Sequence, residues 1–279
     1  MEVNIRSEII QISKLAPLPK IVHQIFKVTS DPTSSARDLS LLIIKDQSLT
    51  AKILKIINSA YYGFNRKIGN VNHAIVILGF DEIKSITMAL CLMKYYPIEQ
   101  SRLFNRELFW KHSIGTAHIA RALSSLKMEL NCEDAYVVGL LHDFGKVILD
   151  QFFPDIFRNA LETAKERKQP LHHVLQESIG INHAEIGGLI AEHWQLPVPL
   201  VNAIRLHHSP EEAADDEYFV HLVQLANYFC HKNMIGASGN PKPDEPYEGS
   251  LKALGIENQD LDQVWDFLNI GAQKINLFL

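Results

Sequence analysis

Several histidines in the second half of the sequence stand beside other residues that could bind a metal ion. They are His112, the adjacent pair His142 and Asp143, His183, and the adjacent pair His207 and His208. Neutral imidazoles and carboxylates that converge from separate elements can bind Mg, Mn, Fe, Ni or Zn, and the two oxygens of one aspartate can bridge two ions. Any one of these histidines alone is more often an ordinary core or surface residue. It is their combination that indicates a metal site.

The elements that must position these residues are predicted to be helices. Strand signals are weak, because β-branched residues do not alternate over a sustained stretch and no Asn-Gly or Asp-Gly hairpin turn occurs. Apolar residues recur instead at helical spacing, as at Ile5, Ile9, Ile12 and Leu15. The sequence therefore predicts an all-α fold. After residue 100 we expect helices over residues 105–126, 134–141, 156–166, 171–178, 183–194, 199–207, 217–232 and 261–275, with a surface loop over 233–249.

The first part of the chain is predicted to form a helical lobe of its own. Pro97 closes it, and we place the boundary near residues 97–103, which divides the chain into lobes of residues 1–100 and 101–279. Asp31-Pro32 indicates a turn in the first lobe. The candidate N-terminal caps of its later helices are Ser35 with Asp38, then Asp46 or Ser48, then Asn72 and Asp81.

Charge is spread unevenly between the two lobes. The 279 residues carry a net charge of −5, but residues 1–100 hold 12 Lys/Arg against 8 Asp/Glu, a net of +4, and the remainder carries −9. Eleven of the 13 histidines also lie beyond residue 100. No basic stripe or aromatic platform accompanies the mild positive charge of the first lobe, so we do not expect nucleic acid as a partner. The acidic, histidine-rich second lobe suits cations better.

The cysteines and the apolar segments indicate where the protein works. Cys91, Cys132 and Cys230 lie far apart and form no Cys-x-x-Cys pair, which is typical of reduced thiols in an intracellular protein. The first twenty residues lack the apolar region of a signal peptide, and other apolar stretches stop well short of the ~18 residues that span a membrane. We expect a cytoplasmic protein without a membrane partner.

The order of several short motifs resembles the HDOD family of bacterial signalling proteins. This family belongs to the HD superfamily of phosphohydrolases and is related to the HD-GYP cyclic-di-GMP phosphodiesterases. The resemblance covers roughly residues 15–232. Its motifs are Leu18-Pro19, Asp46-Gln47-Ser48-Leu49-Thr50, Asn58-Ser59-Ala60, Ala74-Ile75-Val76-Ile77-Leu78-Gly79, Phe109-Trp110-Lys111-His112, His142-Asp143-Phe144-Gly145-Lys146, His183-Ala184-Glu185-Ile186-Gly187-Gly188 and His207-His208.

The resemblance implies a role for each of the candidate residues. Asp143 and Lys146 would be the catalytic residues, with Lys146 in contact with a phosphate or with the nucleophile. The cofactor would be one or two divalent ions of Fe, Mn, Ni, Mg or Zn. The implied ligands of these ions are His112, His142, Asp143, His183, His207 and His208.

Two departures from the family pattern bear on activity. The position of the late aspartate ligand is occupied by Asn227, whose side chain offers a carbonyl oxygen but no charge. The segment after His208 lacks the Gly-Tyr-Pro motif, so hydrolysis of cyclic-di-GMP is not expected. Six further histidines have no supporting motif and are assigned no role: His118, His172, His173, His193, His221 and His231.

Two functions remain open at this point. The departures favour a regulatory signal-transduction module that binds a partner protein or a nucleotide and keeps most of a metal site. The alternative is a metal-dependent phosphohydrolase that acts on a nucleotide or another phosphate ester, because pure binding would not require so many of the metal residues. Nucleic-acid binding through the first lobe is a weaker third hypothesis, since a lobe without a basic stripe predicts little salt-dependent affinity.

Overall fold

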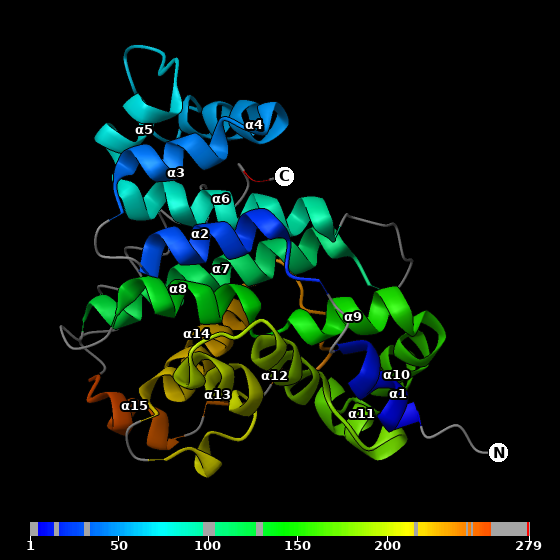
Figure 1. Cartoon of the computed structure of the whole chain (residues 1–279). Coiled ribbons are helices and arrows are strands. Elements are labelled where there is room, and N and C mark those ends of the chain that lie inside the picture. Colours follow the sequence, from blue (N-terminus) through cyan, green and yellow to red (C-terminus); the bar gives the residue numbers. More distant parts are fainter. Residues whose placement is uncertain are drawn as a thin grey trace. The chain divides into compact units, whose positions relative to one another are not determined.

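The structure is a computed structural model that describes residues 5–13, 17–30, 34–96, 104–126, 131–214, 217–243, 245–246, 248–257 and 278. Within these ranges the regular elements are helices and no β-strand forms, which confirms the all-α prediction (Figure 1). No helix of the described part is long and apolar enough to cross a membrane. The helix predicted over residues 261–275 and the turn at Asp31-Pro32 lie outside the described residues.

Contacts within the chain define two compact units. The larger comprises Met1–Ala16 and Ile98–Ala272, and the smaller comprises Pro17–Pro97 and Gln273–Leu279. The N-terminal helix belongs to the larger unit because it packs on α12. That residues 1–100 and 101–279 form separate domains stays a prediction.

The smaller unit contains the helices α2 (Lys20–Ser30), α3 (Ala36–Ile43), α4 (Gln47–Ile57), α5 (Val71–Leu78) and α6 (Phe80–Tyr95). Two of the expected caps form: Ser35 and Asp38 make a capping box on α3, and Asp46 accepts from the backbone N–H of Leu49 on α4. The other two expectations are wrong. Asn70 rather than Asn72 caps α5, and α6 begins after Gly79, so that Asp81 lies in its first turn.

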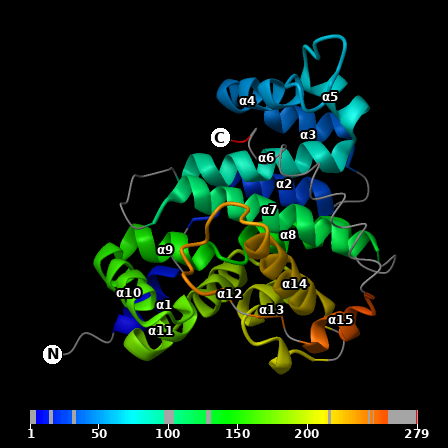
Figure 2. The same cartoon turned by 180° about the vertical axis from the view of Figure 1, so that it is seen from behind.

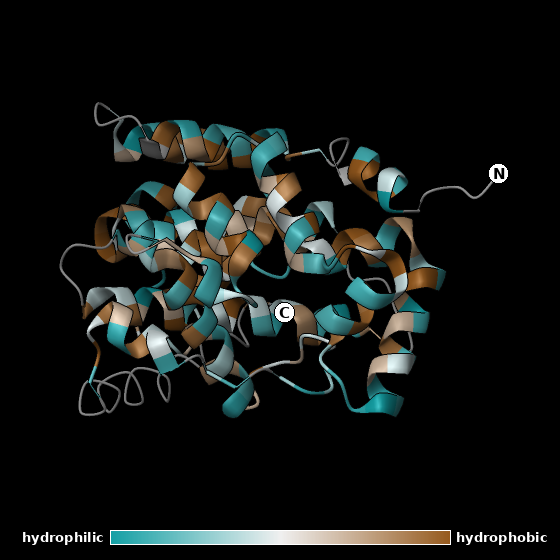
Figure 3. Ribbon diagram, turned by 90° about the horizontal axis from the view of Figure 1, so that it is seen from below, coloured by the Kyte–Doolittle hydropathy of each residue, from teal (hydrophilic) through white to brown (hydrophobic). Residues whose placement is uncertain are grey.

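The larger unit holds every predicted metal residue. Its helices are α1 (Ile5–Ser13), α7 (Arg106–Ser125), α8 (Cys132–Leu141), α9 (Phe144–Phe152), α10 (Pro154–Arg167), α11 (Leu171–Ile179), α12 (His183–His193), α13 (Val198–Leu206), the 3₁₀ turn η1 (Pro210–Glu212), α14 (Tyr218–Lys232) and α15 (Glu248–Leu254) (Figure 2). Many of the helices carry both hydrophobic and hydrophilic residues, as expected of elements with one buried face (Figure 3).

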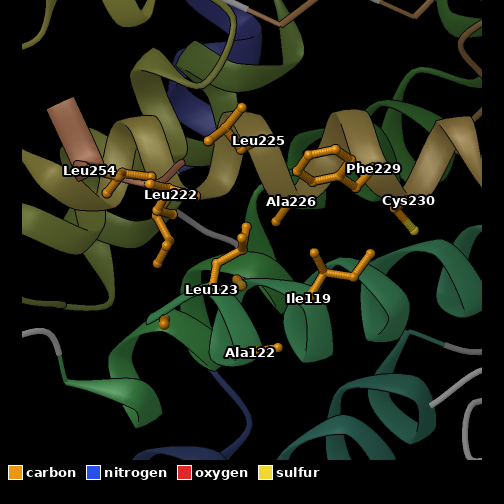
Figure 4. Packing of buried hydrophobic residues seen from close by; sticks show 12 residues of the cluster. Ile119, Ala122, Leu123, Leu222, Leu225, Ala226, Phe229, Cys230 and Leu254 are labelled. Atoms are coloured by element: carbon orange, nitrogen blue, oxygen red, sulfur yellow. The ribbon is translucent and has the colours of Figure 1, made fainter. Parts of the chain in front are cut away.

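A hydrophobic cluster joins α7 to α14 within this unit. Ile119 and Leu123 of α7 pack against Leu222, Leu225 and Phe229 of α14, and all five are at least nine-tenths buried (Figure 4). Burying an aliphatic or aromatic side chain of this size contributes roughly 1.5–3 kcal/mol. The cluster therefore holds the two helices that carry His112 and Asn227 in a fixed relation.

Helix α9 was not predicted from the sequence. It begins directly after Asp143, and its buried residues include Phe144, Val147 and Ile148. Phe144, Val147, Ile148 and Phe152 do recur at helical spacing, but the segment spans only two to three turns, so the signal is short. The consequence is that the His142-Asp143 pair is the whole connection between α8 and α9.

Two glycines allow the helices on either side of this connection to approach their neighbours closely. A Cβ at Gly139 of α8 would lie 2.5 Å from the Cα of Ala117 on α7. A Cβ at Gly145 of α9 would lie 2.0 Å from the carbonyl oxygen of His183 on α12. Because side chains never approach a backbone this closely, both positions require glycine, and Asp143 is thereby held against α12.

We expect Gly145→Ala to destabilise the protein by about 3 kcal/mol, the upper end of the usual cost of overpacking. The added methyl group cannot coexist with the His183 carbonyl, so α9 and α12 must separate. Urea denaturation measures the change. Gly69→Ala is the matched control, because a Cβ there has no atom within 4 Å and the backbone is not left-handed. Equal stability of the two variants would contradict the close approach.

Candidate metal centre

The carboxylate of Asp143 lies at the centre of the predicted site and is only 1% exposed. Its Oδ1 lies 3.1 Å from Nε2 of His183 and 3.7 Å from Nε2 of His207. Its Oδ2 lies 3.4 Å from Nε2 of His142 and 3.9 Å from Nε2 of His112. The two oxygens of one carboxylate therefore face two different sets of imidazoles.

These two sets are named here by the oxygen that they face. The Oδ1 subsite comprises Asp143, His183, His207 and His208, and the Oδ2 subsite comprises His112, His142 and Asp143. Within each subsite the possible ligand atoms lie within 4.8 Å of one another. His208 joins the first group through its Nε2, which lies 2.9 Å from Nε2 of His183. The ligands come from α7, from the end of α8, from the start of α12 and from the turn after α13.

Backbone carbonyls orient two of the imidazoles. Nδ1 of His142 donates to the carbonyl oxygen of Gly139, and Nδ1 of His207 donates to that of Ile204, each at 2.8 Å. A carbonyl can only accept, so the proton of each neutral ring is on Nδ1 and the Nε2 lone pair is directed toward Asp143. In the described part of the chain, neither Nε2 makes a hydrogen bond although both are buried. This is the arrangement that metal-binding histidines use.

Lys146 pairs with the other oxygen of the carboxylate. Its ammonium donates to Oδ2 of Asp143 at 2.6 Å, one turn along α9, and the side chain is 2% exposed. Removing one partner of a buried ion pair costs roughly 3–5 kcal/mol, because the other charge stays buried without compensation. Lys146 therefore stabilises a carboxylate that could not otherwise remain ionised in this interior.

Asn227 enters the site from α14. Its Oδ1 accepts a hydrogen bond from Nε2 of His112 at 3.0 Å. Nε2 of His112 thus carries the proton in this arrangement, and its Nδ1 is buried without a hydrogen bond in the described part of the chain. A residue that the sequence identified as a departure from the family pattern therefore lies within the cluster, in contact with a predicted ligand.

Burial sets the protonation states of the cluster. Desolvation lowers the pKa of His112, His183 and His208 well below the ordinary value, and it also lowers that of His207. Burial alone would raise the pKa of Asp143, but Lys146 and then His142 hold it well below its usual range. At neutral pH these four imidazoles are therefore neutral and the carboxylate is ionised, and both are the states that bind a divalent cation.

Two histidines without a predicted role also lie at the site. The ring of His172 on α11 stacks on that of His208, with centroids 4.0 Å apart and planes inclined by 13°. The ring of His231 on α14 lies 4.5 Å from that of His112. Neither residue stands in a motif, and the spacing along the chain gives no signal, because only the packing of α11 and α14 brings them here. All seven predicted site residues gather in one cluster, and their roles as ligands and catalytic groups stay predictions.

Comparisons with known proteins place the chain in a family. A model of the HDOD domain family matches residues 15–210. A solved HDOD domain protein of unknown function from Geobacter sulfurreducens is 25% identical, with a TM-score of 0.74 over 91% of this chain and 82% of that chain. A solved candidate phosphohydrolase from Shewanella amazonensis SB2B shares the fold at 19% identity, with a TM-score of 0.77 over 98% of this chain and 97% of that chain.

A curated relative matches over a shorter part of its length. An uncharacterized protein from Treponema pallidum (strain Nichols) is 27% identical over 219 residues, which are 78% of this chain and 42% of that protein. The chain thus spans less than half the length of this relative.

The HDOD family model matches most of the sequence. The chain therefore belongs to the HDOD domain family, as the motifs predicted.

We expect the purified protein to bind a divalent cation that Asp143→Asn does not retain. The substitution keeps the shape of the side chain and removes the charge that both subsites share, so affinity should fall at least about 100-fold, the upper end of the loss from changing a supporting residue. Mass spectrometry of metal content after incubation with Mn²⁺, Fe²⁺ or Zn²⁺ measures this. When the free cation concentration is about a hundred times the Kd, the free energy of unfolding of the wild type should rise by about 2.7 kcal/mol. That of Asp143→Asn should not rise. A wild type that remains metal-free would contradict the expectation.

Acid should destabilise the metal-free protein. In the unfolded chain a histidine has a pKa of about 6.5, whereas burial lowers the pKa of His172 to about 3 and that of His231 to about 4. Below pH 6.5 the unfolded chain therefore binds protons that the folded chain does not, and the free energy of unfolding falls as pH falls toward 4. Urea denaturation at several pH values between 8 and 5, with a chelator present, should show this decline, and His172→Gln should reduce its slope. Constant stability over this range would refute the expectation.

Proposed function

We propose that this chain is a regulatory HDOD module of a bacterial cytoplasmic signalling system, which binds a partner protein or a nucleotide and holds a divalent cation in its larger unit. The observation that carries the proposal is the closure of the centre. His112, His142 and His183 are fully buried, and Asp143 and His207 are 1% exposed. His208 alone among the predicted ligands is partly exposed.

Closure weighs against turnover in this conformation. A phosphate ester must bring its phosphorus next to the groups that react, and catalysis depends on contact distances of about 3 Å. Lys146, the residue that the family resemblance assigns to the phosphate, is instead paired with Asp143 in the interior. A buried cation in such a centre supports a stable conformation of the unit, which a partner can recognise.

The smaller unit offers a surface that suits a protein partner. Val76 and Ile77 at the end of α5 are 80% and 41% exposed, and Leu41 and Ile44 at the end of α3 are 44% and 49% exposed. These two helices pack against each other. Single exposed apolar residues are ordinary, but several on adjacent elements are typical of a protein contact.

A metal-dependent phosphohydrolase is the second candidate, and the composition of the cluster favours it. A divalent ion bound there would polarise a phosphoryl oxygen and lower the pKa of a bound water. The protein's own groups would then hold the ion through Asp143 and the imidazoles, and Lys146 would release the carboxylate to contact the phosphate. The Shewanella protein of the same fold is described as a candidate phosphohydrolase, which is a statement about that protein.

The two candidates differ in turnover and in binding. With Mn²⁺ present, we expect wild type and Asp143→Asn to hydrolyse p-nitrophenyl phosphate, bis-p-nitrophenyl phosphate and cyclic dinucleotides at the same background rate.

A photo-crosslinking residue at position 76 should capture a partner in cells, and Val76→Asp should weaken binding of that purified partner at least tenfold. The control places the photo-crosslinking residue at position 234 instead, because Met234 is 87% exposed and lies on the larger unit. Hydrolysis that Asp143→Asn abolishes would establish the second candidate instead.

A further inference from the structure

The two subsites of the centre differ in what already occupies the carboxylate oxygen. Oδ1 of Asp143 is buried and faces imidazoles, with Nε2 of His183 at 3.1 Å and Nε2 of His207 at 3.7 Å. Oδ2 accepts from the Lys146 ammonium at 2.6 Å. The oxygen shared by His112 and His142 is therefore already bound to a positive charge, whereas the other oxygen is not.

The Oδ1 subsite has the dimensions of a four-ligand cation site. A tetrahedral ion with ligands at about 2.1 Å places its ligand atoms about 3.4 Å apart. In the structure, Oδ1 lies 3.1 Å from Nε2 of His183 and 3.7 Å from Nε2 of His207, and the Nε2 atoms of His183 and His208 lie 2.9 Å apart. Three imidazoles and one carboxylate suit Zn²⁺, Mn²⁺ or Fe²⁺.

The Oδ2 subsite is less complete, because it offers two imidazoles, whose Nε2 atoms lie 3.4 Å and 3.9 Å from Oδ2. Nε2 of His112, its nitrogen nearest the carboxylate, is engaged with Asn227 at 3.0 Å. The distance from this nitrogen to Oδ2 is 3.9 Å, while the lysine nitrogen lies at 2.6 Å from the same oxygen. A cation held on Oδ2 would lie beside the Lys146 ammonium, which repels it, and ligation by Nε2 of His112 would break the contact between His112 and Asn227.

The charge of the cluster gives the same result. Asp143 is the only carboxylate in either group of candidate ligands within the described residues. Asp143 already balances the charge of Lys146, so the charge of any bound dication is an uncompensated positive charge in the buried cluster. A second dication would double this excess. Uncompensated charge is costly in an interior of low polarity. An aspartate in place of Asn227 would supply the missing negative charge.

We infer that the centre holds one divalent cation, in the Oδ1 subsite, and that the Lys146 ammonium takes the place of a second ion in the Oδ2 subsite. The inference rests on the proposed function in one respect, which is that the centre binds a cation at all. It assigns His183, His207 and His208 to that ion, and it gives Lys146 and Asn227 the role of limiting the number of ions to one.

The test is the metal content of the full chain. Protein stripped with a chelator is incubated with excess Mn²⁺ or Zn²⁺, passed through a desalting column and measured by mass spectrometry. Wild type should retain one equivalent. His207→Ala should lose it, and His112→Gln should keep it, because only His207 belongs to the Oδ1 subsite. His193→Ala is the matched control, since this exposed histidine lies on α12 with His183 and outside both subsites.

Restoring the charge should create the second site. Asn227→Asp should raise the affinity for a second Mn²⁺ at least tenfold, and the combination with Lys146→Met should give two equivalents with the EPR spectrum of a coupled pair. Because Lys146→Met leaves Asp143 without a counter-charge and can impair folding, Asn227→Asp alone and the pair His207→Ala and His112→Gln keep the test decisive.

The outcomes separate the inference from the proposed function. Two equivalents in the wild type, or loss of the ion in His112→Gln with retention in His207→Ala, would overturn the inference and leave a metal-binding module. A wild type that retains no ion from either metal would overturn the metal site in the proposed function, and the inference with it. One equivalent in the wild type that is lost in His207→Ala and kept in His112→Gln supports both the inference and the metal site of the proposed function.

Discussion

The arrangement of the larger unit depends on one buried anion. The Asp143 carboxylate sits in the only connection between α8 and α9, where water cannot solvate it, so its charge must be met by protein groups. Lys146 meets it from one turn along α9, and imidazoles surround the rest. Gly139 and Gly145 allow α8 and α9 to press against α7 and α12, which carry those groups. The electrostatic requirement and the backbone packing are thus satisfied by the same short segment.

Burial has two opposite effects at this centre. It keeps the imidazoles neutral, because desolvation lowers the pKa of His183 and His208, and neutral imidazole is the form that binds cations. It also removes the ligands from contact with molecules in solution. Under the proposed function, a centre that binds an ion well and a substrate poorly would be suited to holding a conformation. Asp143 and the buried histidines would then serve structure more than turnover.

Sequence alone predicts much of this architecture and less of its detail. Helical spacing predicts the all-α fold, and the ordered motifs predict which histidines converge, because each stands at a helix end or on a helix face. The apolar residues of α9 recur at helical spacing, but only over a short segment, which was not predicted to be a helix. Asn70 and Asn72 are equivalent as caps until the burial of Val71 decides between them. His172 and His231 reach the centre only through packing. The pairing of Lys146 with Asp143 follows from their spacing on α9, but it emerges only once that helix is known.

The ligands are far apart along the chain, and this separation governs when the centre can form. Asn227 and His112 are in contact across 115 residues, and His208 and His183 across 25. Closing such long loops is slow and comes late in folding. Under the proposed function, a cation would find its complete ligand set only after α7, α8, α12 and α13 have docked, so it would stabilise the native state rather than the folding transition state. Such an ion would slow unfolding without accelerating folding, which would lengthen the lifetime of the folded unit.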